Sequence, residues 1–396
     1  MARRAVFNDE HDLFRETVAE FVRREIVPRR ETIREQRKID RSIWAKAGEQ
    51  GLLGIGVPDR YGGAGIDDFR FNAVMQEELV RAGMAYASAF QVHADVVAPY
   101  LVELTTEDQR ARWLPGFCTG ELVTAIGMSE PGGGSDLAAL CTTAVEQDGG
   151  WVMNGSKTFI TNGTDADLVV TAARTPEHGE RSISLFAVEK GMPGFAPGRK
   201  LEKVGQHEAD TAELFFEDVQ LPPENLIGEL GRGFAAMMER LPVERLSSAC
   251  GNVAHAATAL EHTLEYVRER RAFGRPVGSF QANRFLLAEL VTLVDVTQAY
   301  VDQCLLEHVE GQPRPHRHRE GEVVDGRHPE PRARRLRPAL RRLRLHGRER
   351  GRACLERRAR HEDLGRLERD HEGADRALAR AGRRARAGLS RLSPAA

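Results

Sequence analysis

Cysteine is scarce in this sequence of 396 residues, which contains five cysteines and no pair in CxxC or CxxH spacing. Zinc sites need closely spaced ligands, and disulfide frameworks need many cysteines in a short chain, so the sequence indicates neither a metal site nor disulfides. We expect reduced thiols in a cytoplasmic protein. The five cysteines are Cys118, Cys141, Cys250, Cys304 and Cys354.

Long apolar runs and an excess of charge of one sign are also missing. No run approaches the length of a membrane span, and the N-terminal segment is charged and amphipathic where a signal peptide would have an apolar core. The formal net charge is only −2, which argues against a nucleic acid or an anionic membrane as partner of the whole chain. The length suggests two or three domains with a large core.

Hydrophobic spacing divides the chain into a helical, a β-rich and a second helical segment. Up to about residue 120, apolar residues such as Phe14, Val18 and Phe21 recur every three or four positions, which is typical of amphipathic helices. Between residues 121 and 230, short β-rich runs alternate with turns, and Asp148-Gly149-Gly150 predicts a hairpin because glycine tolerates a positive φ. The runs are residues 122–128, 144–147, 151–153, 168–172, 183–188 and 212–216.

Helical spacing returns at Gly233 and continues to about Gly311, with a break at residues 273–276. The two halves are expected to be antiparallel partners in a helical bundle. The sequence therefore predicts an α+β multidomain fold. It has an N-terminal helical domain (residues 1–120), a middle β domain of barrel- or sandwich-like form (121–230) and the first part of a C-terminal helical bundle (231–311) that is incomplete as written.

The tail, residues 312–396, is rich in arginine and contains no Lys, Phe, Tyr, Trp, Ile, Met or Asn. Such a segment cannot build a core like that of the preceding helices, so we expect it to be disordered. A basic arm that binds nucleic acid is one alternative. Natural basic arms usually mix lysine with arginine, however, and the absence of lysine counts against this alternative.

A change of reading frame explains the composition of the tail better. Residues 361–372 read HEDLGRLERDHE, and synonymous codons for them, read one base later, can give TKIWAGSNEIMK. Residues 318–346 can give, in the same way, a peptide with aromatic residues, lysines and helical periodicity. Most first and third bases of each hidden codon are fixed by the written protein. We therefore predict a frameshift between Gly311 and His318.

A glycine-rich segment from Ala125 to Asp136, AIGMSEPGGGSD, follows the first predicted strand. Glycines let backbone N–H groups approach a ligand closely, and the hydroxyl groups add hydrogen-bond donors. The segment is neither a Walker loop nor a dinucleotide fingerprint that opens a helix. Taken alone, it is more often an ordinary tight turn than a ligand site.

Further motifs follow this segment in a fixed order: residues 154–163 (NGSKTFITNG), 214–222 (LFFEDVQLP), 243–245 (VER) and 270–274 (RRAFG), with Gln281 after them. In this order and spacing they resemble the acyl-CoA dehydrogenase family, most closely its long-chain and isovaleryl branch. The resemblance extends from the N-terminus to about Gly311, and the hidden frame resembles the family to its end. It implies FAD as the cofactor and a fatty acyl-CoA as the substrate.

The resemblance assigns cofactor contacts to three groups of residues. The first group belongs to the glycine-rich loop that holds the flavin and the acyl thioester, with Ser135 at the substrate's entrance. The second packs beside the isoalloxazine ring, although Phe159 could also serve packing alone, since aromatic residues are common in strands. The third reaches the FAD of a neighbouring subunit, although an isolated Arg270 would be read as a solvated arginine at a helix end. The groups are, in order, Ile126, Met128, Ser129, Gly134 and Ser135; Phe159, Ile160 and Thr161; and Arg270, Phe273 and Gln281.

Glu244 is the residue that the resemblance assigns as catalytic base. In the long-chain and isovaleryl branch the base lies in a Glu-Arg pair on the earlier helix, and Glu244-Arg245 supplies that pair. In the other branch it lies in a C-terminal Glu-Gly-Thr segment, which reads Ala-Gly-Ser in the hidden frame. A helical glutamate taken alone is more often a surface residue. Relatives often carry an acidic residue two positions before the base, where this chain has Pro242, so we expect Pro242, Val243 and Arg245 to position the substrate differently.

The implied reaction is α,β-dehydrogenation of a fatty acyl-CoA to the trans-2-enoyl-CoA, with electrons passed to an electron-transfer flavoprotein. In the family, hydrogen bonds from the flavin ribityl chain and from the backbone N–H of the base polarise the thioester oxygen. A homotetramer is expected if the C-terminus is intact. The alternatives are a flavin oxidase or monooxygenase of the same fold, and an inactive frameshifted product that aggregates or fails to retain FAD. The acyl chain length cannot be read from the sequence.

Overall fold

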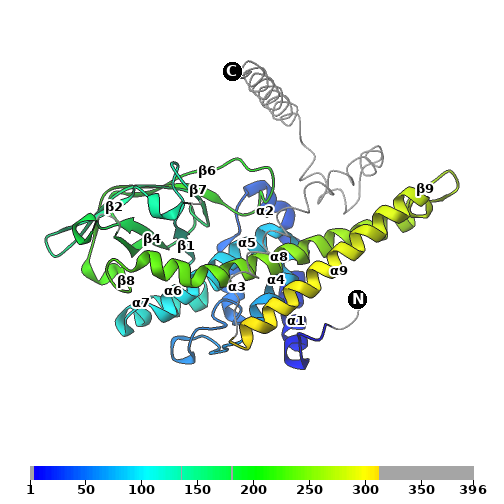
Figure 1. Ribbon diagram of the computed structural model, residues 1–396, viewed down its shortest axis with the longest axis horizontal. Helices are drawn as coiled ribbons and strands as arrows, with labels where there is room; N and C mark the ends of the chain where they lie inside the picture. The colour runs from blue at the N-terminus through cyan, green and yellow to red at the C-terminus, as the bar shows by residue number, and fades with distance from the viewer. Residues whose placement is uncertain (1–3, 135, 180–181, 312–396) are drawn as a thin grey trace, which may run out of the picture. The chain divides into compact units, whose positions relative to one another are not determined.

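The computed structural model describes residues 4–134, 136–179 and 182–311, all of which belong to one compact unit of the chain. Helices come first, strands follow, and two long helices end the described part (Figure 1). This succession confirms the predicted α+β fold class. Ser135 and the predicted disordered, frameshifted tail lie outside the described residues.

The N-terminal helices begin at capping residues that the sequence supplies. The Asn8 side chain accepts hydrogen bonds from the first backbone N–H groups of α1, and Thr106 forms a capping box with Gln109 at the start of α7. Trp44 and Phe90 stack with 4.6 Å between ring centroids in the core of these helices. The helices are α1 (Asp9–Phe21), α2 (Arg30–Gln36), α3 (Arg41–Glu49), α4 (Arg70–Ala82), α5 (Met84–Gln91), the π-helix η4 (Val92–Val97), α6 (Ala98–Glu103) and α7 (Glu107–Thr119).

The middle segment forms a sheet of eight strands in the order β6-β7-β3-β2-β4-β5-β8, with β1 parallel to β4. Five of the six β-rich runs found in the sequence lie within these strands, and the sixth, residues 122–128, extends beyond both ends of β1. The prediction missed β6, which is largely exposed and has no alternating pattern, and β8, which has only two residues. The strands are β1 (Thr124–Gly127), β2 (Thr143–Gln147), β3 (Gly150–Thr161), β4 (Leu168–Arg174), β5 (Ile183–Glu189), β6 (Phe195–Lys200), β7 (Thr211–Leu221) and β8 (Leu226–Ile227).

The sheet curls so that side chains of β3 and β7 meet those of β4 and β5 in one core. Trp151 of β3 packs edge-on against Phe186 of β5, with 5.3 Å between ring centroids. The opposite face of β4, including Leu168 and Val170, packs against the α7 side chains around Trp113. Because both faces of β4 are covered, its residues are apolar almost throughout. This curled sheet is the predicted barrel- or sandwich-like form.

The β2–β3 turn shows how closely local sequence can determine backbone geometry. Gln147 pairs with Gly150, which leaves Asp148 and Gly149 as a two-residue loop. Both loop residues have positive φ, 52° and 79°, as a two-residue hairpin of type I′ requires. The predicted hairpin is confirmed.

Two long helices, α8 (Gly233–Glu269) and α9 (Gln281–Val309), follow the sheet and are joined by a small hairpin of β9 (Arg271–Ala272) and β10 (Arg275–Pro276). A Cβ atom at Gly233 would lie 2.8 Å from the carbonyl oxygen of Ile183, so glycine lets α8 start directly against β5. Further along, α8 packs on α4 and α5. One helix therefore runs from the sheet to the N-terminal helices, and it carries Glu244 between them.

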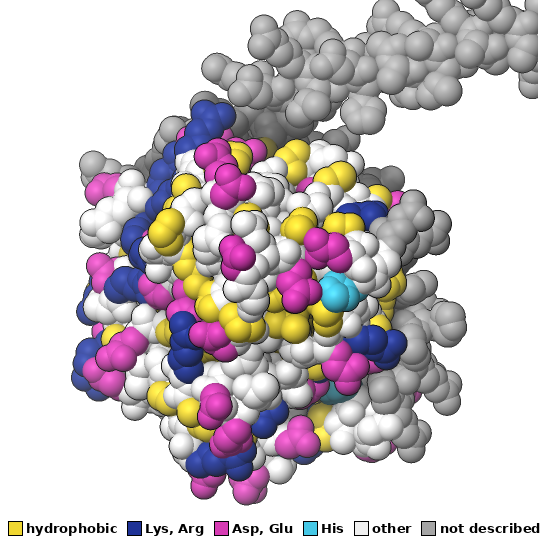
Figure 2. All heavy atoms as spheres, turned by 90° about the vertical axis from the view of Figure 1, so that its left-hand side faces the viewer, with side chains coloured by type: hydrophobic (Ala, Val, Ile, Leu, Met, Phe, Trp, Pro, Cys, Tyr) yellow, Lys and Arg dark blue, Asp and Glu magenta, His cyan; other side chains and the backbone are white. Residues whose placement is uncertain are grey.

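The α9 helix buries few of its apolar side chains among the described residues. Leu290 and Val301 are buried, whereas Phe285 is 67% and Val296 is 63% exposed. The exposed apolar side chains agree with the prediction of a C-terminal helical bundle that is incomplete as written. None of the described helices is both long enough and apolar enough to cross a membrane. On the face in Figure 2, acidic and basic side chains are interspersed, which matches the small net charge.

Candidate active site

Glu244 lies on α8 and faces α6. The hydroxyl of Tyr100 donates a hydrogen bond to Oε1 of Glu244 over 3.1 Å, and Tyr100 is fully buried. Burial raises the pKa of Glu244 to about 7, against the opposing effects of the Tyr100 hydrogen bond and of Arg245 and Arg240. Near neutral pH the side chain can therefore both take up and release a proton.

An arginine one turn before Glu244 holds Tyr100 in place. The Arg240 guanidinium lies 5.2 Å from the centroid of the Tyr100 ring, which is within the range of cation–π attraction. Arg240 Nη2 also donates to the Glu103 carboxylate over 2.6 Å. The sequence motifs missed Tyr100, Arg240 and Glu103. Only Arg240 carried a local signal, because it lies four residues before Glu244 and so shares its helix face.

A buried carboxylate, Asp95 on η4, holds α8 one turn after Glu244. Ser247 donates a hydrogen bond to Asp95, and so do Asn72 over 2.8 Å and Gln76 over 3.2 Å. Burial raises the pKa of Asp95 to about 6 although all three hydrogen bonds favour the carboxylate. Two contacts with neighbouring elements thus hold the segment of α8 that carries Glu244. Tyr100 of α6 binds Glu244 itself, and Asp95 of η4 binds Ser247 one turn later.

The glycine-rich loop is fixed to β3 by one buried ion pair. Lys157 Nζ lies 2.7 Å from Oε1 of Glu130, and both side chains are almost fully buried. Glu130 also accepts backbone hydrogen bonds from Cys141 and Thr142, and the carbonyl of Ser129 accepts one from the backbone N–H of Thr158 over 2.9 Å. The structure therefore brings the loop residues Ile126, Met128 and Ser129 next to the segment 159–161, as the cofactor prediction requires.

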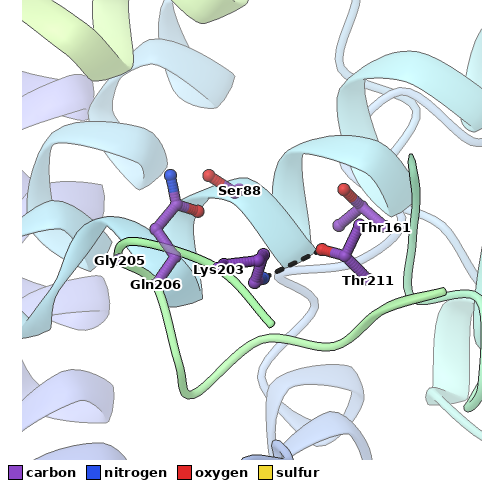
Figure 3. A pocket seen from close by; sticks show the side chains of 6 residues that line it. All are labelled: Ser88, Thr161, Lys203, Gly205, Gln206 and Thr211. Atoms are coloured by element: carbon purple, nitrogen blue, oxygen red, sulfur yellow. Dashed lines mark hydrogen bonds between the residues drawn. The ribbon is translucent and has the colours of Figure 1, made fainter. Parts of the chain in front are cut away.

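The segment 159–161 presents its three residues in different ways. Phe159 has φ of 59° and is 72% exposed, whereas the Ile160 side chain is buried in the β core, so only the backbone of Ile160 is available to a ligand. Thr161 lines a cavity of about 390 Å³ together with Ser88 of α5 and the segment of Lys203 (Figure 3). Lys203 donates there to Thr211 over 2.9 Å.

This surface fits a flavin. A Phe159 ring left in water forgoes about 1.5–3 kcal/mol of hydrophobic stabilisation, which a flat aromatic ligand lying over it would recover. Cβ atoms added at Gly132 and Gly134 would meet nothing within 4 Å, so space is open above the loop backbone. Ile126 and Met128 are half-buried beside it. The structure thus offers the predicted flavin an exposed aromatic ring at Phe159, open space over the glycine-rich loop and a cavity beside Thr161.

The third group of predicted cofactor residues lies elsewhere. Arg270 caps the end of α8, Gln281 begins α9 and Phe273, at the tip of the hairpin, is 95% exposed. Arg270 follows Glu244 by 26 positions on α8, a separation of roughly 40 Å at 1.5 Å per residue. Figure 1 shows the β9 hairpin at the end of α8 opposite the sheet that carries the glycine-rich loop, which is consistent with the predicted contact to a neighbouring subunit.

The predicted substrate residues Pro242, Val243 and Arg245 surround Glu244 on α8, and all three are half-buried. Pro242 lies inside the helix. Proline has no backbone N–H, so it cannot donate to the carbonyl of Met238. The helix therefore lacks the backbone hydrogen bond from position 242 to the carbonyl of Met238, which lies six residues before Glu244.

Helices, a β domain and helices in this order, with a half-buried carboxyl group at Glu244 and an exposed Phe159 ring next to the glycine-rich loop, are typical of a class of flavin-dependent enzymes. The chain belongs to the acyl-CoA dehydrogenase family: residues 8–121 match its N-terminal domain, 125–219 its middle domain and 231–323 its C-terminal domain.

The relatives support this assignment over most of their length. The long-chain specific acyl-CoA dehydrogenase of rat mitochondria (Rattus norvegicus) is 43% identical over 311 residues, which cover 77% of this chain and 71% of the rat protein. The crystal structure of an acyl-CoA dehydrogenase from Geobacillus kaustophilus superposes with a TM-score of 0.76 at 43% identity, covering 78% of this chain and 82% of the other. An acyl-CoA dehydrogenase from Bacillus anthracis complexed with FAD is 29% identical, with a TM-score of 0.73, over 81% of this chain and 55% of the other.

The predicted family, the FAD cofactor and the class of enzyme, an oxidoreductase acting on CH–CH groups, are thereby confirmed. The roles of individual site residues, the domain boundaries and the frameshift stay predictions.

Proposed function

We propose that the chain dehydrogenates fatty acyl-CoA to the trans-2-enoyl-CoA with Glu244 as the base. The observation that carries this proposal is a half-buried carboxyl group on α8 with a pKa of about 7 and an orienting hydrogen bond from Tyr100. The α C–H of a thioester is a weak acid, and a base whose pKa lies near the working pH abstracts its proton most effectively.

In the proposed step, Glu244 accepts the α-proton on a carboxylate oxygen. The electron pair of the Cα–H bond forms the new Cα=Cβ double bond, and the β-hydrogen leaves with its two electrons. When FAD is bound, it supplies the acceptor for this hydride. Glu244 ends the step protonated and must return its proton to solvent before the next turnover.

One detail implied by the family resemblance does not fit α8. The resemblance gives the backbone N–H of the base a part in polarising the thioester oxygen. Glu244 lies in the interior of α8, where each N–H donates to the carbonyl four residues earlier, so its N–H is already used. We therefore assign this polarisation to donors other than the backbone of Glu244.

An electron-transfer flavoprotein is the proposed acceptor of the electrons, and a homotetramer the proposed assembly. Support for the assembly comes from Arg270, Phe273 and Gln281, which one chain leaves distant from its own glycine-rich loop. A dehydrogenase that uses this acceptor should reoxidise slowly in air, whereas rapid reoxidation would favour an oxidase or monooxygenase. The cytoplasmic location stays a prediction.

Replacing the base tests the proposed reaction directly. The Glu244→Gln variant of the FAD-loaded chain, mixed without oxygen with a series of straight-chain acyl-CoAs, should bleach its flavin about 10²–10⁴ times more slowly, because general-base catalysis is lost. Glu265→Gln, which changes an exposed glutamate farther along the same helix, serves as the control and should bleach at the parent rate. Equal bleaching by Glu244→Gln and the parent would exclude Glu244 as the base.

A further inference from the structure

The proposed reaction needs a carboxylate but does not by itself require a tyrosine against it. Tyr100 is fully buried, and its hydroxyl reaches Oε1 of Glu244. Burial, together with the negative charge of Glu244, raises the pKa of the Tyr100 phenol well above its ordinary range. The phenol therefore keeps its proton at any working pH and remains a donor to the glutamate.

The surroundings of Tyr100 prevent it from turning away. Its ring lies against the Arg240 guanidinium, and Arg240 is in turn held by Glu103, three residues after Tyr100 on α6. Arg240 itself is 8% exposed. A side chain fixed by packing and by a second layer of hydrogen bonds can hold a reacting group in one orientation.

We propose that Tyr100 is a positioning residue that holds Oε1 of Glu244, leaves Oε2 to meet the α-hydrogen of the substrate and favours the ionised form of the carboxyl group. This inference rests on the proposed role of Glu244 as the base. Tyr100 contacts the base, and it acts on the substrate only through that contact.

The charges that face Glu244 set the expected pH dependence. On α8 these are Arg240 and Arg245, and α6 contributes Tyr100 as a neutral donor and Glu103 beside it. Both arginines and the tyrosine hydroxyl favour the carboxylate, and burial opposes them. Removing the Tyr100 hydroxyl takes away one of the groups that lower the pKa of Glu244, while burial continues to raise it, so this pKa should rise.

A direct titration tests the proposal without substrate or turnover. The full chain is labelled with ¹³C at the glutamate carboxyl carbons, and the Glu244 signal is identified by its absence in Glu244→Gln. In Tyr100→Phe the pKa of Glu244 should rise by about one pH unit, the size expected when a hydrogen bond to a charged group is lost. The control is Tyr61→Phe, which removes another tyrosine–glutamate hydrogen bond, to Glu107, and should leave the Glu244 titration in place.

A second variant keeps the shape of the tyrosine and reverses the sign of the effect. Fluorotyrosine incorporated at position 100 is a stronger donor than tyrosine, so the pKa of Glu244 should fall below that of the parent chain. An unchanged Glu244 pKa in both Tyr100→Phe and the fluorotyrosine chain would overturn the proposal.

The pH profile of turnover separates this proposal from the proposed function. In Tyr100→Phe, kcat should fall about fivefold at pH 7, recover at high pH and change more than KM, because a base with a higher pKa is ionised less at pH 7. A loss of kcat that is the same at every pH would indicate a merely structural role and contradict the inference. A chain whose Glu244 titrates as expected but that dehydrogenates no acyl-CoA would refute the proposed function and leave the Tyr100 contact intact.

Discussion

The middle of α8 and its C-terminal end lie in opposite surroundings, although one continuous helix connects them. Around Glu244 the helix is half-buried, and Tyr100 and Asp95 hold it from neighbouring elements through Glu244 and Ser247. At the far end, Arg270 caps the helix and Phe273 extends almost entirely into solvent. The comparison teaches that the contacts of Glu244 come from within one chain, whereas Phe273, a predicted cofactor residue at the other end of the helix, is exposed to solvent.

The strongest test of this contrast removes the buried carboxylate that holds α8. Asp95→Ala leaves three buried donors, Asn72, Gln76 and Ser247, without their acceptor. Each unsatisfied buried donor is unfavourable by about 1–3 kcal/mol, whereas loss of the carboxylate removes a burial penalty of up to about 3 kcal/mol at pH 7, because burial raises the pKa of Asp95 from 3.8 to about 6. The free energy of unfolding should therefore fall by about 3–5 kcal/mol in urea denaturation at pH 7.

Asp295→Ala is the matched control, because Asp295 is an exposed residue of α9, and it should change stability by less than about 0.5 kcal/mol. Equal losses in the two variants would show that the middle of α8 is no more tightly fixed than α9.

A smaller effect should appear when the charge of the base is removed. Burial raises the pKa of Glu244 from 4.5 to about 7, so the folded chain binds this proton more tightly than the unfolded chain. Stability therefore falls as pH rises from about 4.5 to 7 and then levels off, by at most about 3 kcal/mol. Glu244→Gln removes this penalty and should raise Tm at pH 8 while leaving it nearly unchanged at pH 4. If Glu265→Gln, at an exposed position of the same helix, gives the same gain at pH 8, net charge and not burial is the cause.

Sequence patterns predicted what depends on neighbours along the chain. The start of α8 at Gly233 and the hairpin at Asp148-Gly149 follow from local spacing and from glycine's freedom of φ. The Glu244 position came from a short motif that resembles a family. Each of these signals spans only a few residues, so it can be recognised without knowledge of the tertiary fold.

The contacts that prepare the site could not be predicted in this way. Tyr100 and Glu244 are 144 positions apart, and Glu130 and Lys157 are 27 apart on different elements. No spacing rule relates such residues, because the packing of α6 on α8 and of the loop on β3 brings them together. A charged motif residue such as Lys157, by contrast, would be assigned to solvent from its type alone, yet it is fully buried in its ion pair.

The smallest effect on stability is expected at the far end of α8, where the structure leaves side chains exposed. Phe273→Ala should change the free energy of unfolding of the FAD-free chain by less than about 0.5 kcal/mol, because the ring is 95% exposed and meets Phe280 edge-on at 6.1 Å. Arg270→Ala, at a half-buried position, should change it by at most about 1 kcal/mol. If these side chains contact the FAD of a neighbouring subunit, both variants should nevertheless lose FAD on gel filtration more readily than the parent. Arg271→Ala, at an exposed position beside Arg270, should retain FAD as the parent does. If Arg270→Ala and Phe273→Ala instead lose stability markedly and keep their FAD, this end of α8 is a structural element and not a contact surface, which contradicts the contrast drawn above.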